Sequence, residues 1–168
     1  MDLFVTTGGV SVGEHDLVRD VLSADGLAID FWEIAMRPGK PLMFGNYRGT
    51  PMLGLPGNPV STLVCSLLFL KPALDRLSGL PDEAAPAVTA RLAVSLKQND
   101  RRQDYLRARL TRAPDGILEV TPFEVQDSSM MRPLAAADCL VMRPPHAPAL
   151  PAGSEVPIIP FPGGALPL

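Results

Sequence analysis

A glycine-rich turn between a predicted strand and a predicted helix constrains the fold of this chain more than any other feature. Residues 3–26 read LFVTTGGVSVGEHDLVRDVLSADG. The short apolar run at the start is typical of a strand in a sheet that is buried on both faces. Gly8 and Gly9 end that run, and they allow positive φ and a close approach of backbone to a ligand. The residues after Gly13 have the apolar spacing of an amphipathic helix, at Leu17, Val18, Val21 and Leu22.

This turn has the features of an anion-binding site. A helix N-terminus presents free N–H groups and the positive end of a dipole, and open α/β sheets bind ligands at the carboxyl ends of their strands. A tight connection without a ligand is the alternative, and the spacing GGVSVG does not fit the dinucleotide fingerprint. Asp16 would either cap the helix electrostatically or hold a divalent metal next to a phosphate. Together with Ser11, it gives residues 8–16 the parts of a metal–phosphate site.

Length and composition exclude several classes of protein. The 168 residues could form one domain or two small ones, and a net charge of −3 gives no basic surface for nucleic acid. No apolar run reaches the roughly 18 residues of a membrane span. Cys65 and Cys139 are far apart in apolar surroundings, so we expect buried, reduced thiols in a cytoplasmic protein. The chain starts directly on a buried-type strand without a signal segment, which suggests a fragment of a longer protein.

A second loop rich in proline and glycine follows residues 28–36, which we predict to be a strand. On a regular strand Glu33 and Arg37 would share one side. The loop reads RPGKP from Arg37 to Pro41, so two prolines stiffen it and two cations, Arg37 and Lys40, straddle a glycine. A solvated turn and an anion clamp are both open interpretations of this loop.

A third such loop precedes a helix. Residues 41–55 are predicted to form a β-hairpin, and LPGNPV follows it. Asn58 is a good N-cap, and Pro59 stands at the first helical position, where proline is favoured. The helix over residues 60–70 is largely apolar and is kinked or restarted at Pro72.

The pattern changes to short strands beyond a predicted linker at residues 80–86. Turn signals between the strands indicate a small all-β barrel or sandwich. Residues 99–104 form a charged connector, which we interpret as a solvated loop. The predicted strands cover residues 88–96, 105–111, 118–122, 139–142 and 155–159.

Three signals, TTGGVSVGEHD, MRPGKP and GLPGNPVS, occur in this order with their intervals and resemble the molybdopterin molybdenumtransferase family, the bacterial MoeA proteins and the E domain of gephyrin. In the second half RRQDYLRARL, QDSSMM and LAAADCLVM are similar to the C-terminal β domain of that family. The resemblance implies an α/β region over residues 1–80, part of a three-layer αβα molybdopterin-binding domain. A small all-β, barrel-like domain over residues 82–168 would follow it.

The resemblance also implies an activity and its residues. The family inserts molybdate into adenylylated molybdopterin with Mg²⁺ and releases AMP. Asp16 matches an active-site aspartate and metal ligand, and Arg37 and Lys40 stand at or near basic catalytic positions. The residues implied to bind the substrate are Gly8, Gly9, Ser11, Gly13, Pro38, Gly39, Pro56, Gly57, Asn58, Pro59 and Ser128.

The same resemblance implies a homodimer in the full-length protein and contacts with other molybdenum-cofactor proteins, without a nucleic-acid or membrane partner. The family's first domains are absent, so we expect the chain to be an incomplete part of the enzyme. A non-catalytic anion-binding or scaffold module is the alternative. Glu33 departs from the family, which has lysine there: it would either oppose the anion or pair with Lys40 or Arg37, and we favour the pair.

Overall fold

The computed structural model describes residues 1–9, 17–81 and 88–161. It divides into two compact units, Met1–Ala84 and Ala85–Leu168. The predictions for Ser11, Gly13 and Asp16 lie outside the described residues.

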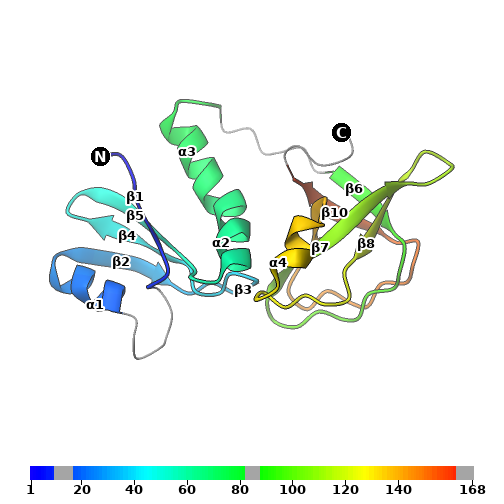
Figure 1. Ribbon diagram of the computed structural model, residues 1–168, viewed down its shortest axis with the longest axis horizontal. Coiled ribbons are helices and arrows are strands. Elements are labelled where there is room, and N and C mark those ends of the chain that lie inside the picture. Colours follow the sequence, from blue (N-terminus) through cyan, green and yellow to red (C-terminus); the bar gives the residue numbers. More distant parts are fainter. Residues whose placement is uncertain (10–16, 82–87, 162–168) are drawn as a thin grey trace. The chain divides into compact units, whose positions relative to one another are not determined.

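The first unit contains a mixed sheet of four strands (Figure 1). In spatial order these are β1 (Phe4–Thr7), β5 (Thr50–Leu55), β4 (Met43–Tyr47) and β2 (Leu27–Trp32). β1 is parallel to β5, and both β5 and β2 are antiparallel to β4. Three strands, β1, β5 and β2, therefore run in the same direction, and their carboxyl ends meet at one edge of the sheet.

One face of this sheet is packed against α1 (Leu17–Ala24). Its buried centre, Leu27, Met43 and Met52, is extended by partly buried side chains from both elements: Phe4, Leu22, Trp32 and Tyr47. β1 is an edge strand of the described sheet and is only half-buried, which differs from the predicted strand buried on both faces. Val21 of α1 is 62% exposed and lines an open apolar groove together with Phe4.

The predicted hairpin and the helix after it are confirmed as β4–β5 and α2 (Pro59–Cys65). The helix continues through a π-helical turn, Ser66–Leu70, into α3 (Lys71–Leu77). Lys71 N–H donates to the Ser66 carbonyl, five residues back, immediately before Pro72. Pro72 has no N–H to donate to a preceding carbonyl. The helix does not end there, because the backbone changes locally from i→i−4 to i→i−5 hydrogen bonding.

The predicted strand over residues 28–36 is wrong beyond Trp32. β2 already shifts register between Ile29 and Phe31, and Glu33 has a φ of +87°, which no regular strand allows. The chain then turns back, with Glu33 N–H donating to Leu42 O and Ile34 N–H to Lys40 O, at 3.0 and 2.9 Å. Glu33 and Arg37 are therefore not on one strand; β3 (Met36–Arg37) is a separate short element.

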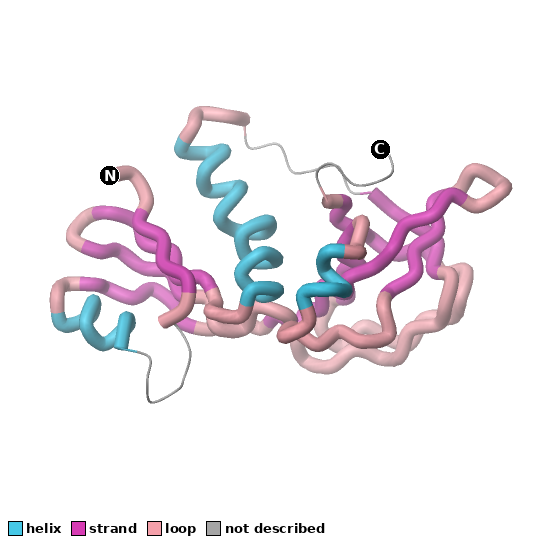
Figure 2. The backbone as a smooth tube through the Cα atoms, in the orientation of Figure 1, coloured by secondary structure: helices cyan, strands magenta, loops and turns pink. Residues whose placement is uncertain are grey.

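The second unit is the predicted β-barrel (Figure 2). Its strands are β6 (Val88–Leu92), β7 (Gln103–Arg112), β8 (Leu118–Pro122), β9 (Cys139–Arg143) and β10 (Glu155–Pro160). They pair in the order β8–β6–β10–β9–β7, and β7 pairs again with β8 to close the barrel. Apolar side chains from all five strands fill it. A short helix, α4 (Met131–Ala135), was not predicted.

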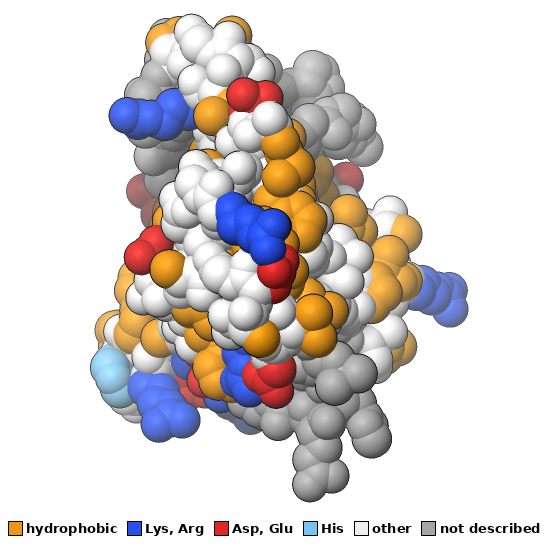
Figure 3. Space-filling view, turned by 90° about the vertical axis from the view of Figure 1, so that its left-hand side faces the viewer, with side chains coloured by type: hydrophobic (Ala, Val, Ile, Leu, Met, Phe, Trp, Pro, Cys, Tyr) orange, Lys and Arg blue, Asp and Glu red, His pale blue; other side chains and the backbone are white. Residues whose placement is uncertain are grey.

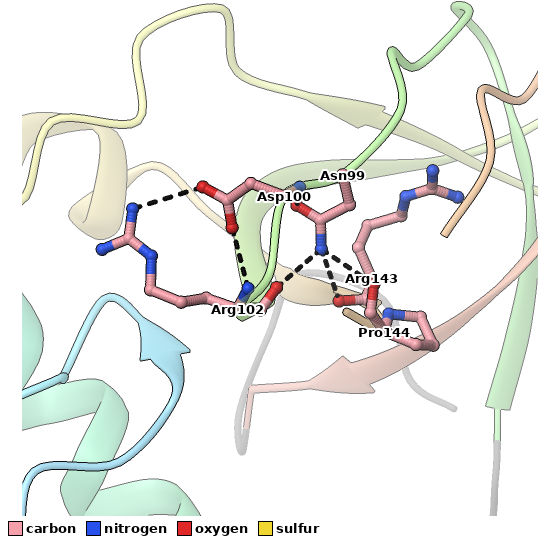
Figure 4. Close-up of polar contacts among 5 residues, drawn as sticks. All are labelled: Asn99, Asp100, Arg102, Arg143 and Pro144. Atoms are coloured by element: carbon pink, nitrogen blue, oxygen red, sulfur yellow. Dashed lines mark hydrogen bonds and ion pairs between the residues drawn. The ribbon is translucent and has the colours of Figure 1, made fainter. Parts of the chain in front are cut away.

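The connector at residues 99–104 is not simply a solvated loop, because Asn99 is 9% exposed and its side chain is hydrogen-bonded at the end of β9 (Figure 4). Its Nδ2 donates to the carbonyl oxygens of Arg102, Arg143 and Pro144 at 2.8, 3.0 and 2.9 Å. Its Oδ1 accepts from Asp100 N–H at 2.9 Å. One amide thus joins the connector to the end of β9.

No helix in the described part of the chain is long and apolar enough to cross a membrane. On the face that Figure 3 shows, Lys and Arg side chains (blue) do not form one continuous patch, and those at the centre lie against acidic side chains (red). Both thiols are buried and free of disulfides, as predicted.

The Asn99 amide generates a stability prediction. Asn99→Asp replaces the donor group with a carboxylate oxygen that faces three carbonyl oxygens, so we expect a loss of about 3 kcal/mol in the free energy of unfolding. Chemical denaturation followed by circular dichroism measures the loss. Arg101→Gln, at an exposed position of the same connector, is the control and should change stability by less than about 0.5 kcal/mol. Equal stability of the two variants would contradict the role of the amide.

Candidate functional site

Three of the predicted loops meet at one edge of the sheet in the first unit. Gly8 follows β1, residues 56–58 follow β5, and residues 33–42 connect the end of β2 to β4. Because these three strands run in the same direction, all three loops lie at their shared carboxyl edge, beside the start of α2 (Figure 1). This is the edge at which open α/β sheets place ligands.

The loops after β1 and β5 are in close backbone contact. Gly8 N–H donates to Leu55 O at 3.0 Å, so the parallel pairing with the last residue of β5 continues one residue beyond β1. A Cβ atom on Gly57 would lie 3.3 Å from the Cα of Gly8, so a side chain there would crowd the turn. Gly9 has a φ of +75°, and a Cβ at that position would lie 2.3 Å from Cγ2 of Val18. The glycines thus allow two loops and a helix to pack without side chains between them.

The PGNP loop is fixed by helix capping. Asn58 Oδ1 accepts from Val60 N–H at 3.1 Å and from Ser61 N–H at 3.5 Å. The hydroxyl of Thr62 donates to Pro56 O and to Asn58 O. Since the Asn58 side chain already serves two N–H groups of α2, its structural role accounts for its position in the loop.

The loop over residues 33–42 carries the predicted ion pair. Lys40 Nζ lies 3.0 Å from Glu33 Oε2, with 50% and 29% of the two side chains exposed. The pairing that we favoured for Glu33 is therefore confirmed. Glu33 holds its positive φ within this loop, a conformation that costs energy for a residue with a Cβ.

The same loop is anchored to α2 through Gly39. The Cys65 thiol lies 3.8 Å from Gly39 O, and burial raises the pKa of this thiol to about 12. Arg37 is half-buried in the loop and precedes a cis peptide bond to Pro38. Cys65 is thus a packing residue, and the loop displays Lys40 at its surface.

Arg19 and Trp32 also lie at this site, although no sequence motif points to them. The guanidinium carbon of Arg19 lies 4.3 Å from the centroid of the Trp32 ring, at the end of β2. Nε and Nη2 of Arg19 lie 2.9 and 2.8 Å from Oδ1 of Asp20. No spacing rule connects an arginine on a helix with a tryptophan 13 positions later, so only the packing of α1 on β2 reveals this pair.

The described residues do not form a metal site by themselves. Among residues 1–9, 17–81 and 88–161 no group of three His, Cys, Asp or Glu side chains could hold a metal ion. Mg²⁺ commonly uses only one or two carboxylates and takes its other oxygens from phosphate and water. The predicted ligand Asp16 lies outside the described residues.

Ser128 belongs to the second unit, where a buried arginine shapes its turn. Arg107 is fully buried, and its Nη1 donates to the carbonyl oxygens of Asp127 and Met130 at 3.0 and 3.3 Å. Its Nε and its backbone N–H both donate to Gln126 Oε1, at 3.2 and 3.0 Å. Ser128 is half-buried between these anchors.

The Asp127 carboxylate and the Arg107 guanidinium carry opposite charges at this turn, and each affects the pKa of the other. Ser129 donates its backbone N–H and its hydroxyl to the Asp127 carboxylate, and with the Arg107 guanidinium this lowers the pKa of Asp127. Burial lowers the pKa of Arg107, and the charge of Asp127 opposes that shift. The hydrogen bonds from Arg107 Nη1 and from Ser129 N–H hold the turn that carries Ser128.

Chemically, the sheet edge suits a polyanionic ligand. It combines closely packed glycine backbone with cations on three elements or loops: Arg19, Arg37 and Lys40. Backbone N–H groups and cations are the groups that bind phosphate and other oxyanions.

Two family models match the chain. Residues 1–76 match the probable molybdopterin binding domain, and residues 89–161 match the MoeA C-terminal region (domain IV). The two matches correspond to the sheet unit and the barrel unit.

Individual relatives agree with both matches. The chain is 35% identical over 161 residues to a molybdopterin molybdenumtransferase of Haemophilus influenzae, covering 95% of this chain and 40% of that protein. It is 36% identical over 160 residues to molybdopterin molybdenumtransferase 2 of Mycobacterium tuberculosis, covering 92% of this chain and 39% of the relative. The chain thus spans about two fifths of the length of these relatives.

A solved structure shares the fold. The molybdopterin biosynthesis MoeA protein of Pyrococcus horikoshii superposes with a TM-score of 0.74 at 28% identity, over 96% of this chain and 38% of that one. Sequence motifs, sheet topology, barrel and relatives agree, and the chain belongs to the molybdopterin molybdenumtransferase family.

Proposed function

We propose that this chain acts in molybdenum cofactor biosynthesis as part of an enzyme that inserts molybdate into adenylylated molybdopterin and releases AMP. The observation that carries the proposal is the meeting of the TTGG, RPGKP and PGNP loops at one sheet edge. The substrate contains a pyrophosphate and molybdate is an oxyanion, so both need the donors and cations of such an edge.

In this proposal each loop has a separate task. The Gly8 N–H donates to Leu55 O, so the N–H groups of the turn from Gly9 onward bind phosphate oxygens, and the close contact of Gly8 with Gly57 keeps side chains out of their way. Arg37 and Lys40 offset negative charge as AMP leaves. The family resemblance also implies a substrate-binding role for Ser128 of the barrel unit. Mg²⁺, with Asp16 as its ligand, would polarise the pyrophosphate bond. The protein would work as a homodimer in the cytoplasm.

One alternative is a module that binds the anion without turnover. The ion pair between Glu33 and Lys40 favours this alternative. Glu33 stands where the family has lysine, and its carboxylate engages Lys40, one of the proposed cations. The chain also spans only about 40% of the relatives' length. Measurements of turnover and of binding separate the two functions.

The first prediction concerns turnover. We expect AMP release from adenylylated molybdopterin, with Mg²⁺ and molybdate, to require a protein that also carries the regions of the relatives that this chain does not span. The chain alone should bind molybdate without catalysing release. Chromatographic quantification of AMP, with and without molybdate, tests this. Release by the chain alone at the rate of the longer protein would refute the requirement.

The second prediction concerns Lys40. Removal of its charge by Lys40→Met should weaken molybdate binding to the chain about fivefold, which corresponds to about 1 kcal/mol for one partly screened charge. Lys71→Met is a matched control, because Lys71 is also about half exposed (58%) and ion-paired, to Asp75 on α3. Equilibrium dialysis with molybdate compares them, and equal affinities would place Lys40 outside the site.

The same titration resolves the role of Glu33. Glu33→Lys removes the partner that orients Lys40 and adds a like charge beside it, so we expect weaker binding than in the parent chain. Tighter binding would show instead that Glu33 opposes the anion.

The third prediction concerns Asp16. If it serves metal or phosphate chemistry, Asp16→Asn in the longer protein should reduce AMP release at least tenfold and leave thermal stability nearly unchanged. Differential scanning calorimetry and the AMP assay are run on the same preparation. A loss of more than about 2 kcal/mol of stability would identify Asp16 as a structural residue.

A further inference from the structure

The guanidinium group of Arg19 is fixed on one edge and one face. Its Nε and Nη2 lie 2.9 and 2.8 Å from a single oxygen of Asp20, so one of its two donor edges, the Nε–Nη2 edge, is occupied. The guanidinium carbon lies over the Trp32 ring, 4.3 Å from the ring centroid. The Arg19 side chain is nevertheless 31% exposed, so part of the group remains open to solvent.

The indole beneath this cation is held by the core. Trp32 packs against the cluster of Leu27, Met43 and Met52, and its backbone is paired with Met43, which is fully buried. A planar cation on a fixed aromatic ring is pre-organised, because little side-chain freedom is left to lose when a ligand binds.

The stack lies at the same sheet edge as the proposed phosphate and molybdate groups. Val18, the neighbour of Arg19, packs against Gly9 of the glycine turn. Trp32 is followed directly by Glu33, which holds Lys40. The Arg19–Trp32 stack is thus joined by adjacent residues both to the turn and to the loop that carries Lys40.

We propose that the solvent-exposed side of the Arg19 guanidinium stacks on a flat nitrogen heterocycle of the substrate, giving a sandwich of heterocycle, guanidinium and indole. Guanidinium planes stack on bases and aromatic rings, and Asp20 already occupies the Nε–Nη2 edge that could bind an oxyanion in a bidentate manner. This inference rests on the proposed function, whose substrate offers two such rings, a pterin and an adenine. Arg19 would therefore position a ring and not the reacting oxygens.

The test compares ligands with and without a ring on the 168-residue chain. The probes are AMP, pterin-6-carboxylate and ring-free pyrophosphate, with Kd values from isothermal titration calorimetry. Arg19→Lys keeps the charge but removes the stacking plane. We expect it to weaken one or both ring ligands about tenfold and to leave pyrophosphate binding within twofold. The ligand that is weakened identifies the ring as adenine or pterin.

Arg48→Lys is the matched control. Arg48 also lies over an aromatic ring, 5.5 Å from the centroid of Tyr47, and also pairs with a carboxylate, that of Asp25. It lies in the β4–β5 turn, at the opposite edge of the sheet, and its replacement should change no affinity. Trp32 is the one tryptophan of the chain, so ring binding should also change its fluorescence, and this change should be lost in Arg19→Lys.

Asp20→Asn provides a second test that does not depend on Arg19→Lys folding. The Asp20 side chain is 66% exposed, and its neutralisation makes the Nε–Nη2 edge of Arg19 available to an anion. Pyrophosphate binding should tighten while ring binding persists.

The possible failures are distinct. Equal weakening of pyrophosphate and ring ligands by Arg19→Lys would show a role of charge alone and overturn the stacking. Unchanged ring affinities, or binding of pyrophosphate without either ring ligand, would overturn it too. Absence of pyrophosphate binding in the parent chain would contradict the proposed phosphate site, and the ring ligands would still decide the stacking.

Discussion

The backbone contact between Gly8 and Gly57 is the constraint on which the candidate site depends. It extends the parallel pairing of β1 and β5 through the hydrogen bond from Gly8 N–H to Leu55 O. A side chain on Gly57 would separate the two loops, and one on Gly9 would displace α1 from the sheet through Val18. Since α1 carries Arg19, the position of this cation also follows from the glycines. The glycine turn is thus a packing requirement as well as a proposed ligand site.

The two units stabilise their loops by different physical means. In the sheet unit glycines allow the loops to pack closely, backbone to backbone. The Asn58 cap and the contact of Cys65 with Gly39 hold the loops in place. In the barrel unit polar side chains hold the loops through hydrogen bonds to the backbone. Asn99 donates to three carbonyl oxygens, and Arg107 donates to the turn that carries Ser128. Nη1 and Nε of Arg107 reach carbonyl or amide oxygens, while Nη2 of Arg107 is buried without a hydrogen-bond partner among the described residues.

Local chemistry made much of the fold predictable. A hairpin between residues 41 and 55, the helix start at Asn58–Pro59 and the five barrel strands follow from turn residues, capping and alternation, and all are present. The prediction of one strand over residues 28–36 is wrong beyond Trp32, because the apolar pattern continues there while the backbone turns at Glu33. The two prolines and Gly39 nearby indicate that a turn occurs in this region, but they do not predict that it begins at Glu33. α4 is too short to show a helical period.

By itself, the sequence determined which loops could bind an anion and to which family they belong, because glycine, proline and cap residues act on the backbone within a few positions. It left open which loops meet, since strand order depends on pairing between distant segments. Only the tertiary structure decided that β1, β5 and β2 end at one edge, that Glu33 pairs with Lys40 and that Arg19 lies on Trp32. The last two contacts join side chains on different elements or across a turn, and their energy arises only after the backbone has folded.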